Sequence, residues 1–599
     1  MTVFQEPIAE VIWDLKYRYR KQNKIIDHSI ESTWLRIAKA VAKAEPLPQR
    51  SMWQKNFYDI LENFQFLPGG RIIAGAGTKH TVTLFNCFVM PVSDSLTSIF
   101  NALKEGALTL QEGGGVGYDF STLRPHGFPV AHAGAVASGP ISFMRIWNSM
   151  CATMQSTGAR RGAMMGVLRC DHPDIEEFIT AKSDPHELRH FNVSVLVSDA
   201  FMQAVKNNSE WELIFPIEES DDLTDVVYRK WSGSHEKIPC RIVRCINARD
   251  LWQKIIRSAY DYAEPGVIFE DTINNQNNLW YHEWISATNP CGEIPLPAYG
   301  ACNLGAINLT TFVINPYSEN ASLDWGKIRE TTAIATRFLD NVIDVSRYPL
   351  KMQKHQAHAT RRIGLGLTGL ADMFVMLGVS YGSDASLKLA ARVMKLISET
   401  TWHVSIELAK ERGSFLFFEK EKYLQGSFVK TLPIEIREDI AKFGIRNSHH
   451  NTIAPTGTIS LLANNVSNGI EPIFSASYDR TVRNPEGELM KFSVMDYALR
   501  IWKNNHTENL PPAWVDSQSL APEQHLQIQA AVQPYIDNAI SKTINIPENF
   551  PFERLMEVYS QAYALGLKGC TVFRPNQVTG SVLTATDPND ATDRCCQFL

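Results

Sequence analysis

The sequence lacks long apolar runs and a strong charge of either sign. No apolar stretch is long enough to span a bilayer, and the first twenty residues contain Glu6 and Glu10, unlike a signal peptide. The net charge is only −6 over 599 residues, so the chain has no strong field for nucleic acid or anionic membranes. We therefore expect a globular protein of the cytoplasm.

The sequence also lacks paired cysteine motifs, although it contains ten cysteines. No Cys-x-x-Cys occurs, and Cys240 and Cys245 have no His-x-x-x-His partner nearby. A structural zinc site is therefore not expected. In a large chain without a signal peptide, the cysteines are expected to be reduced thiols rather than a disulfide scaffold.

Three segments of different composition follow one another along the chain. Residues 1–66 are rich in helix formers, which predicts a small helical N-terminal domain. Residues 67–575 alternate short apolar or β-branched runs with longer helical patterns, which predicts an α/β domain with mainly parallel strands. Residues 576–599 are largely polar, which predicts a flexible tail. The clearest expected strands are 81–90, 193–197 and 451–454, and the clearest expected helices are 325–345, 386–412 and 552–565.

Cys291 lies between an amide, Asn289, and a carboxylate, Glu293. Pro290 biases the residue before it toward extended backbone, and Gly292 permits a sharp turn, so the cysteine is expected on the tip of a loop. A structural turn with a buried cysteine is the commoner situation for a single cysteine. The flanking groups also suit a polyol substrate, because a carboxylate can take a proton from one hydroxyl while an amide holds another oxygen.

Other cysteines allow two interpretations each. Cys87 lies in an apolar, strand-like run and is either a core thiol or half of a redox pair with a distant partner. Cys302 follows Cys291 closely. Cys595 and Cys596 lie just before the C-terminus, where they suit thiol–disulfide exchange, with an accidental pair as the alternative.

Three further segments are rich in glycine or hydroxyl groups. Residues 454–460 follow an expected strand and precede an apolar helical run, which indicates either an anion site or a plain helix cap. Residues 113–117 predict a close backbone approach, at a tight turn or against a substrate. Residues 364–369 match the dinucleotide fingerprint formally, but the polar residues 355–362 before them favour close helix packing instead.

Taken in order, these elements resemble the catalytic subunit of ribonucleotide reductase over residues 67–574. The resemblance rests on five separated elements, which are Asn86-Cys87, residues 113–117, residues 289–293, Cys302 and residues 455–460. It implies a ten-stranded α/β barrel with a finger loop through its centre.

The resemblance also implies a role for each site residue. Cys291 would become a thiyl radical that takes the 3′-hydrogen of a ribonucleotide, Glu293 would act as base on the 3′-hydroxyl, and Asn289 would hold the ribose. Cys87 and Cys302 would supply two electrons. Cys595 and Cys596 would then reduce their disulfide and be reduced by a thioredoxin- or glutaredoxin-like donor. The residues implied to bind substrate are Asn86, Gly115, Pro455, Thr456, Gly457 and Thr458.

Regulatory residues are implied in the same way. Asp94, Ser95 and Arg124 resemble positions that bind a dNTP or ATP effector at the interface of a homodimer. Arg160 and Arg161 resemble the loop that relays effector identity to the substrate base, although such a pair is by itself usually a solvated face. The N-terminal segment is too short for a full ATP cone, so control of specificity without an overall dATP switch is expected.

The source of the radical is the remaining question. The reductases that use a metal-containing second subunit carry a stacked tyrosine pair, expected near residues 568–573, where none occurs. The glycyl-radical motif and its paired Cys-x-x-Cys zinc site are also absent. The Asn-Pro-Cys-Gly-Glu form resembles the adenosylcobalamin-dependent reductases, so we expect that cofactor, ribonucleoside diphosphates as substrates, and no metal held by protein side chains. The alternatives are a subunit that needs a separate radical-generating partner, and a non-catalytic nucleotide-binding regulator.

Overall fold

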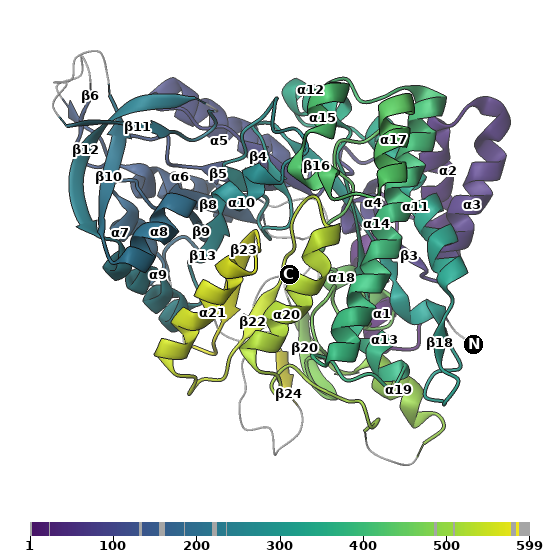
Figure 1. Ribbon diagram of the computed structural model, residues 1–599. Coiled ribbons are helices and arrows are strands. Elements are labelled where there is room, and N and C mark those ends of the chain that lie inside the picture. The colour runs from purple at the N-terminus through teal and green to yellow at the C-terminus, as the bar shows by residue number, and fades with distance from the viewer. Residues whose placement is uncertain are drawn as a thin grey trace.

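A computed structural model of the chain describes residues 3–22, 24–130, 135–154, 162–184, 186–217, 225–234, 236–483, 488–506, 510–576 and 583–585. Helices surround a large sheet (Figure 1). The N-terminal helices lie at the right of this view, and a small antiparallel sheet lies at the left. Among the described residues, no helix has both the length and the apolarity needed to cross a membrane.

The N-terminal region is helical, as its composition predicts. Its helices are α1 (Pro7–Ile12), α2 (Ile30–Val41), α3 (Arg50–Glu62) and α4 (Gly70–Gly75). Helix α2 begins at a capping box, in which Ser29 and Ser32 each accept a hydrogen bond from the other's backbone N–H. Its apolar residues recur on one face, and Trp34 and Ile37 are fully buried. Burial of this stripe fixes α2 against α3 and α11 (Trp325–Val345).

Two groups of parallel strands form the barrel. The first group contains β4 (Cys87–Met90), β5 (Gly115–Asp119), β8 (Met164–Arg169), β9 (Phe191–Val197) and β13 (Gly266–Phe269). The second contains β16 (Ala301–Asn308), β19 (Ile363–Thr368), β22 (Thr543–Asn545) and β23 (Gly569–Phe573). Most of these strands are buried along their whole length, as in parallel sheets covered on both faces.

Two antiparallel seams join the groups, one between β4 and β16 and one between β13 and β23. Parallel bridges then close the ring, since Leu365 pairs with Asn451 and Ile453 pairs with Ile540 just before β22. The short strand β3 (Phe66–Pro68) pairs with β16 as well, which makes a ten-stranded sheet. The expected α/β barrel is therefore confirmed.

The remaining elements cover the barrel. A small sheet of β10 (Glu210–Pro216), β12 (Lys237–Asn247) and β11 (Val226–Lys230) is inserted after β9, and β20 (Ser477–Arg483) pairs with β21 (Leu489–Met495). Helices that bear on the site or its surroundings are α5 (Leu96–Gln111), α6 (Pro140–Thr153), α9 (Ala248–Tyr262), α10 (Glu270–Asn275), α12 (Lys351–Thr360), α13 (Leu370–Met376), α14 (Asp384–Arg412), α18 (Gly457–Leu462), α19 (Tyr497–Lys503), α20 (Pro522–Val532) and α21 (Phe552–Ala564).

Most of the expected elements are present. The helix over 325–345 is α11, that over 386–412 lies within α14, and that over 552–565 is α21. The strand over 193–197 lies within β9, whereas only residues 87–90 of the strand expected over 81–90 are extended in the sheet. Residues 451–454 contribute single bridge pairs rather than a continuous strand.

One expectation is wrong. Residues 364–369 do not pack helices together, because 363–368 form strand β19, connected to the parallel strand β16 through α11 and α12. Burial on both faces removes the polar alternation by which a strand is usually recognised. Within the segment expected to be a flexible tail, the described residues Leu583–Ala585 form β24 on the edge of β20, where a hairpin offers unpaired backbone groups. The flexible tail as a whole stays a prediction.

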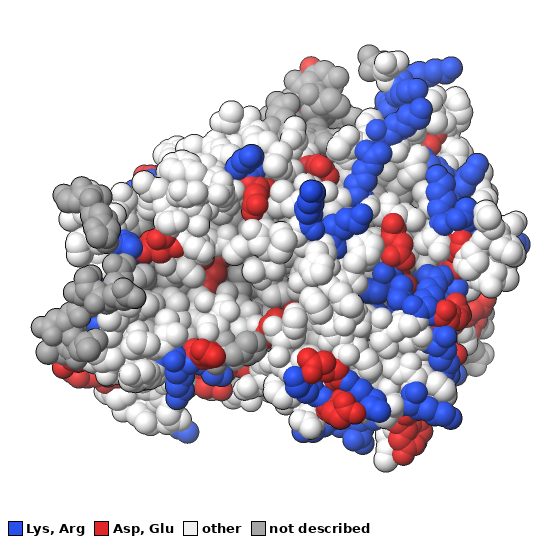
Figure 2. Space-filling view, turned by 90° about the horizontal axis from the view of Figure 1, so that it is seen from above, with Lys and Arg blue, Asp and Glu red and all other residues white. Residues whose placement is uncertain are grey.

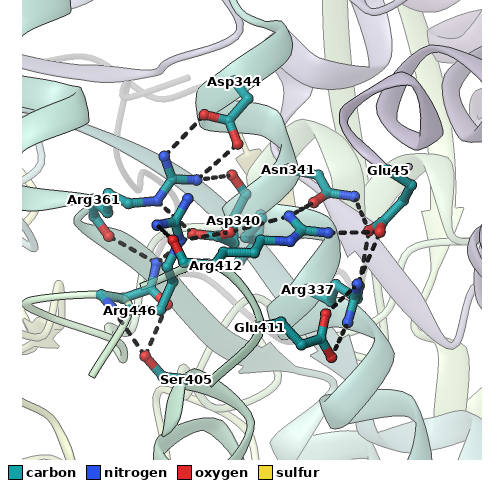
Figure 3. A network of polar contacts seen from close by, with 12 residues as sticks. Glu45, Arg337, Asp340, Asn341, Asp344, Arg361, Ser405, Glu411, Arg412 and Arg446 are labelled. Atoms are coloured by element: carbon teal, nitrogen blue, oxygen red, sulfur yellow. Dashed lines mark hydrogen bonds and ion pairs between the residues drawn. The ribbon is translucent and has the colours of Figure 1, made fainter. Parts of the chain in front are cut away.

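A buried ion-pair network connects the N-terminal region to the barrel helices (Figure 3). The carboxylate of Glu45 is fully enclosed and bonds Arg337, Asn341 and Arg412 at 2.6–2.8 Å. Burial alone would raise the pKa of Glu45, but these hydrogen bonds lower it overall. A second carboxylate, Asp340, pairs with Arg361 at 2.8 Å. Glu45 is therefore a charged contact that holds the two parts of the chain together.

The face of the molecule seen from above carries charges of both signs (Figure 2). Figure 2 shows both signs of charge on one face, with lysine and arginine gathered on the half where α2 and α3 lie in Figure 1. This mixture agrees with the small net charge of −6.

We expect the substitution Glu45→Ala to lower the free energy of unfolding by about 3–5 kcal/mol, because it leaves the buried guanidinium group of Arg337 and the partly buried one of Arg412 without their shared carboxylate. Glu411→Ala is the matched control, since Glu411 also bonds Arg337 but its side chain is 49% exposed. The control should cost at most about 1 kcal/mol. Chemical denaturation of both variants checks this, and equal losses would contradict it.

Candidate active site

Cys291 lies at the tip of a hairpin, as its neighbours predict. Strands β14 (Ala287–Thr288) and β15 (Pro295–Leu296) pair antiparallel and form the stem. The tip turns at Gly292, whose φ is +81°, and the N–H of Gly292 donates to the carbonyl of Asn289 at 3.0 Å. A positive φ favours glycine, so the residue after the cysteine is the one that allows the turn.

The hairpin, which we call the finger, lies inside the barrel and contacts both groups of strands. On one side, Asn192 of β9 donates from Nδ2 to the carbonyl of Pro290 at 2.8 Å. On the other side, the carbonyl of Glu293 accepts from the Thr452 hydroxyl at 2.9 Å and from the Ala539 N–H at 3.0 Å. The tip is therefore held from opposite walls of the barrel.

Glycine residues in β5 make room for the finger. A Cβ at Gly117 would lie 1.8 Å from the carbonyl oxygen of Thr288. A Cβ at Gly115 would lie 3.0 Å from the Pro290 ring. The glycine-rich segment 113–117 therefore brings backbone close to the finger, and it also forms the turn between α5 and β5.

The base of the finger is fixed by polar contacts. Asn274 accepts from the N–H of Ile285 and donates to its carbonyl, both at 2.8 Å. Glu283, just before, forms an ion pair with Arg362 at 2.5 Å, and both side chains are nearly fully buried. The sequence gives no signal for these partners, because Asn274 and Arg362 lie on α10 and at the start of β19.

Cys87 and Cys302 lie opposite each other at the seam between β4 and β16. Directly opposed residues in antiparallel strands have Cα atoms about 4.5–5.5 Å apart, within the range of about 4.4–6.8 Å that a disulfide spans. Both thiols are free and buried, with exposed fractions of 2% and 0%. Cys291, by contrast, is exposed. The structure thus brings together a buried thiol pair and one accessible thiol.

The finger tip contacts this thiol pair directly. The Asn289 side chain donates from Nδ2 to the Cys87 sulfur at 3.2 Å, and the Cys87 thiol donates to Oε1 of Glu293 at 3.8 Å. Burial, and then the charge of Glu293, raise the pKa of Cys87 well above its ordinary value. Burial also raises the pKa of Cys302. Both groups therefore carry their hydrogen at neutral pH, so they act as thiols rather than thiolates.

A cavity opens in front of Cys291, between the two groups of strands. Most of the predicted site residues line it, namely Asn86, Cys87, Gly115, Asn289, Cys291, Glu293, Pro455, Thr456 and Thr458. Gly457 and Cys302 do not line it. The N–H of Gly457 donates to Oδ1 of Asn468 at 3.0 Å. Thr456 is buried and its hydroxyl contacts Thr368 and Asn468. Thr458, by contrast, is only partly buried.

Many cavity residues come from outside the predicted set, and two of them have polar side chains. Tyr17, from the N-terminal region, and Arg71 both line the cavity. Gly113 allows Arg71 to approach, since a Cβ there would lie 2.5 Å from its guanidinium group. The run Leu67-Pro68-Gly69-Gly70 before Arg71 was a usable signal for a close backbone approach, whereas nothing in the sequence marks Tyr17.

The residues predicted to bind an effector lie away from this cavity. Arg124 forms an ion pair with Asp94 at 2.7 Å. Ser95 caps α5 by accepting a hydrogen bond from the N–H of Ser98 at 3.2 Å. The structure therefore brings Asp94 and Arg124 together at the start of α5. The predicted residues Arg160, Arg161, Cys595 and Cys596 lie outside the described residues.

A finger that carries a cysteine inside an α/β barrel, beside an opposed thiol pair, defines a class of thiol-dependent enzyme site. The ribonucleotide reductase barrel domain matches residues 85–573, and the all-alpha domain of the same enzymes matches residues 3–81. The chain therefore belongs to the ribonucleotide reductase family.

Named relatives agree with this assignment. The chain is 37% identical over 572 residues to a vitamin B12-dependent ribonucleoside-diphosphate reductase of Mycobacterium tuberculosis (strain CDC 1551 / Oshkosh), which covers 92% of this chain and 76% of that protein. It is 35% identical over 601 residues to the enzyme of the same name from Thermoplasma acidophilum, covering 97% and 72%. The ribonucleoside-diphosphate reductase subunit alpha of Chlamydia pneumoniae is 26% identical, covering 93% and 58%.

We expect Gly117→Ala to destabilise the protein by roughly 1–3 kcal/mol, because the added methyl group overlaps the backbone of the finger. Gly326→Ala is the control, since a Cβ there would meet only Asp324, at 3.5 Å. Alanine is favoured over glycine in helices by up to about 1 kcal/mol, so the control should not lose stability. The free energy of unfolding of both variants is measured by denaturant titration. A Gly117→Ala protein as stable as the unaltered protein would contradict the placement of the finger.

Proposed function

We propose that the protein reduces ribonucleoside diphosphates to 2′-deoxyribonucleotides by thiyl-radical chemistry, with adenosylcobalamin as its cofactor. The observation that carries this proposal is the accessible Cys291 on the finger beside the buried thiols Cys87 and Cys302. The names of the relatives from M. tuberculosis and T. acidophilum support both the diphosphate substrate and the cofactor.

The proposed reaction balances with the groups that line the cavity and with Cys302, which lies opposite Cys87 beside it. Cys291, as a thiyl radical, takes the hydrogen atom from C3′ of the ribose, and Glu293 accepts the proton of the 3′-hydroxyl. The C2′–O bond breaks and the oxygen leaves as water. Cys87 and Cys302 supply two hydrogen atoms, one to C2′ and one to the water, and form a disulfide. Cys291 then returns its hydrogen atom to C3′, and Glu293 returns the proton to the 3′ oxygen.

The protonation of the buried thiols supports these roles. A thiol can give up a hydrogen atom only while it holds one, and burial raises the pKa of both Cys87 and Cys302. Asn289 would hydrogen-bond the ribose from the same finger. Because Glu293 accepts a hydrogen bond from Cys87, the proposed base and the proposed reductant are already in contact.

The cofactor is consistent with the residues present. When bound, adenosylcobalamin would supply the radical equivalent, and Cys291 would be the residue that becomes the thiyl radical. Cys291 is the accessible thiol of the three, and β23, over residues 569–573, contains no tyrosine that could pass a radical from a second subunit. A tyrosine pair of that kind is expected in the alternative, a subunit that needs a separate radical-generating partner.

The substrate would occupy the cavity that Cys291 faces. Oδ1 of Asn86 is buried and makes no hydrogen bond within the described part of the chain, so it can accept one from the substrate. Gly115 and Pro455 would lie along the substrate, and Thr456, Gly457 and Thr458 would form the loop for its phosphates. Thr458 would contact them directly, whereas Thr456 and Gly457 would shape the loop through Asn468.

Other parts of the chain, away from the cavity, would bind the proposed partners. A homodimer would form through α5 and α6, which leave Leu96, Phe100, Leu108 and Ile146 exposed. A dNTP or ATP effector would bind near Asp94, Ser95 and Arg124 at the start of α5, and Arg160 and Arg161 would relay its identity. Cys595 and Cys596 would exchange with a thioredoxin- or glutaredoxin-like donor in the cytoplasm.

The cofactor proposal is tested with the purified chain alone. We expect it to convert a ribonucleoside diphosphate to the deoxy product when adenosylcobalamin and a dithiol are added. Product that forms only with a metal-containing second subunit would contradict the cofactor assignment. Tight nucleotide binding without turnover under either condition would instead indicate a non-catalytic regulator.

We expect Cys291→Ser to lower turnover by at least about three orders of magnitude, because a hydroxyl cannot replace the thiyl radical and loss of the reacting atom removes the whole pathway. Cys302→Ser should likewise prevent disulfide formation and repeated turnover. Cys245→Ser is the control, since Cys245 is exposed on β12, outside the cavity. Product formation is quantified by chromatography, and measurable multiple turnover by Cys291→Ser would overturn the radical role.

A further inference from the structure

A second, small cavity lies beside the finger and shares no lining residue with the proposed substrate cavity. Ile285, just before the finger, and Pro295, in its stem, form part of the apolar wall. Asn277, Asn538 and Lys568 line the same cavity with polar groups. The cavity has room for about one water molecule.

The amide of Asn277 offers a hydrogen-bond donor to this cavity. Its Oδ1 accepts the N–H of Leu279 at 3.0 Å and bonds Nε2 of His449 at 3.1 Å. Because a backbone N–H can only donate, the oxygen must face Leu279, and the NH₂ group lies on the other side. Nδ2 is buried and has no hydrogen-bond partner among the described residues, and the exposed fraction of Asn277 is 2%.

The amide of Asn538 offers a hydrogen-bond acceptor. Its Nδ2 donates to the carbonyls of Ile363 and Asn451, at 3.3 and 3.0 Å. Because carbonyl oxygens can only accept, the orientation of this amide is fixed as well, with Oδ1 turned away from both carbonyls. Oδ1 is buried and accepts no hydrogen bond within the described part of the chain, and Asn538 is 2% exposed.

Lys568 adds a third polar group to the cavity wall. Its side chain is buried, and Nζ donates to the carbonyls of Asp537 and Asn538. An ammonium group has three N–H donors, so one remains for the cavity. The chain neighbours of the two amides are already in contact, since Nδ2 of Asn278 donates to Asp537 at 3.2 Å. One unpaired donor and one unpaired acceptor therefore lie close together around a single small space.

We propose that this cavity binds one water molecule, which bridges Asn277 and Asn538 and so joins the chain before the finger to the segment that holds the finger. A water molecule can accept from Nδ2 of Asn277 and from Lys568 while it donates to Oδ1 of Asn538. Buried polar groups without partners are costly, which favours occupancy. A metal cation would meet the donor groups of Asn277 and Lys568, and an anion would meet Oδ1 of Asn538, so neither suits these residues.

The bridge bears on the finger through Ala539, the residue after Asn538. Ala539 donates its N–H to the carbonyl of Glu293 at 3.0 Å, and its own carbonyl accepts from the Thr452 hydroxyl at 2.9 Å. A water molecule that holds Asn538 therefore also steadies a contact of the finger tip. This inference concerns the support of the finger and is independent of the reaction that the protein catalyses.

A crystal structure at a resolution that shows ordered water tests the site directly. We expect one density peak at about 2.7–3.2 Å from both Nδ2 of Asn277 and Oδ1 of Asn538. Crystals soaked in caesium or bromide salts should show no anomalous signal there, because the ligand is neutral. A cavity without density, an anomalous peak, or either amide turned onto a protein partner would overturn the proposal.

Hydrogen exchange in solution tests the effect on the finger. In Asn277→Leu we expect exchange of the Ala539 N–H to become roughly 5- to 150-fold faster, the factor that corresponds to a buried polar group losing its partner. The N–H of Leu279 should also exchange faster, because it loses Oδ1 whatever the cavity binds. Ala539 lies on the other side of the bridge, so its N–H reports the water.

Asn275→Leu is the matched control, because Asn275 is the last residue of α10 and is exposed. It should leave the exchange of both amides unchanged. Faster exchange at Leu279 with unchanged exchange at Ala539 in Asn277→Leu would overturn the bridge. If Asn277→Leu does not fold, the density in the unaltered protein still decides whether the water is bound.

Discussion

The structure depends on placing a hairpin inside a closed ring of strands. Backbone groups in such a place have no access to bulk water, so the barrel itself must satisfy them. It does so from opposite walls, because Asn192 bonds the carbonyl of Pro290 while Thr452 and Ala539 bond that of Glu293. The absence of a side chain at Gly117 supplies the space. These contacts fix the position of Cys291 at the end of the cavity.

The closed ring also fixes where a thiol pair can form. Parallel neighbours continue around each group of strands, and the two groups meet only at antiparallel seams. Cys87 and Cys302 are directly opposed at one of these seams, next to the finger tip. The polar groups of the tip, Asn289 and Glu293, contact Cys87. The geometry that holds the radical cysteine proposed here therefore also holds its proposed reductant within reach of the same substrate.

Local sequence patterns predicted those features of the fold that depend on residues close together in the sequence. The helix at Trp325–Val345 and the turn after Cys291 follow from periodicity and from the residues beside them. The opposition of Cys87 and Cys302 could not follow from their spacing, because it depends on the pairing of strands far apart in sequence, and only the family resemblance implied it. Strand β19 was misread for a related reason, since a strand buried on both faces shows no alternation. The sequence did not point to Asn468, because its side chain contacts Thr456 and Gly457 only in the folded structure.

Buried carboxylates act in two different ways in this fold, and their surroundings decide which. Arginine side chains surround Glu45 and Asp340, so the pKa of each is lowered in spite of burial, and these groups stay ionised as parts of the scaffold. No arginine forms an ion pair with Asp372 or Asp496 among the described residues, and burial raises the pKa of both. A buried carboxylate thus stays charged where arginines join the N-terminal helices to the barrel, and is shifted toward its neutral form where burial outweighs its polar contacts.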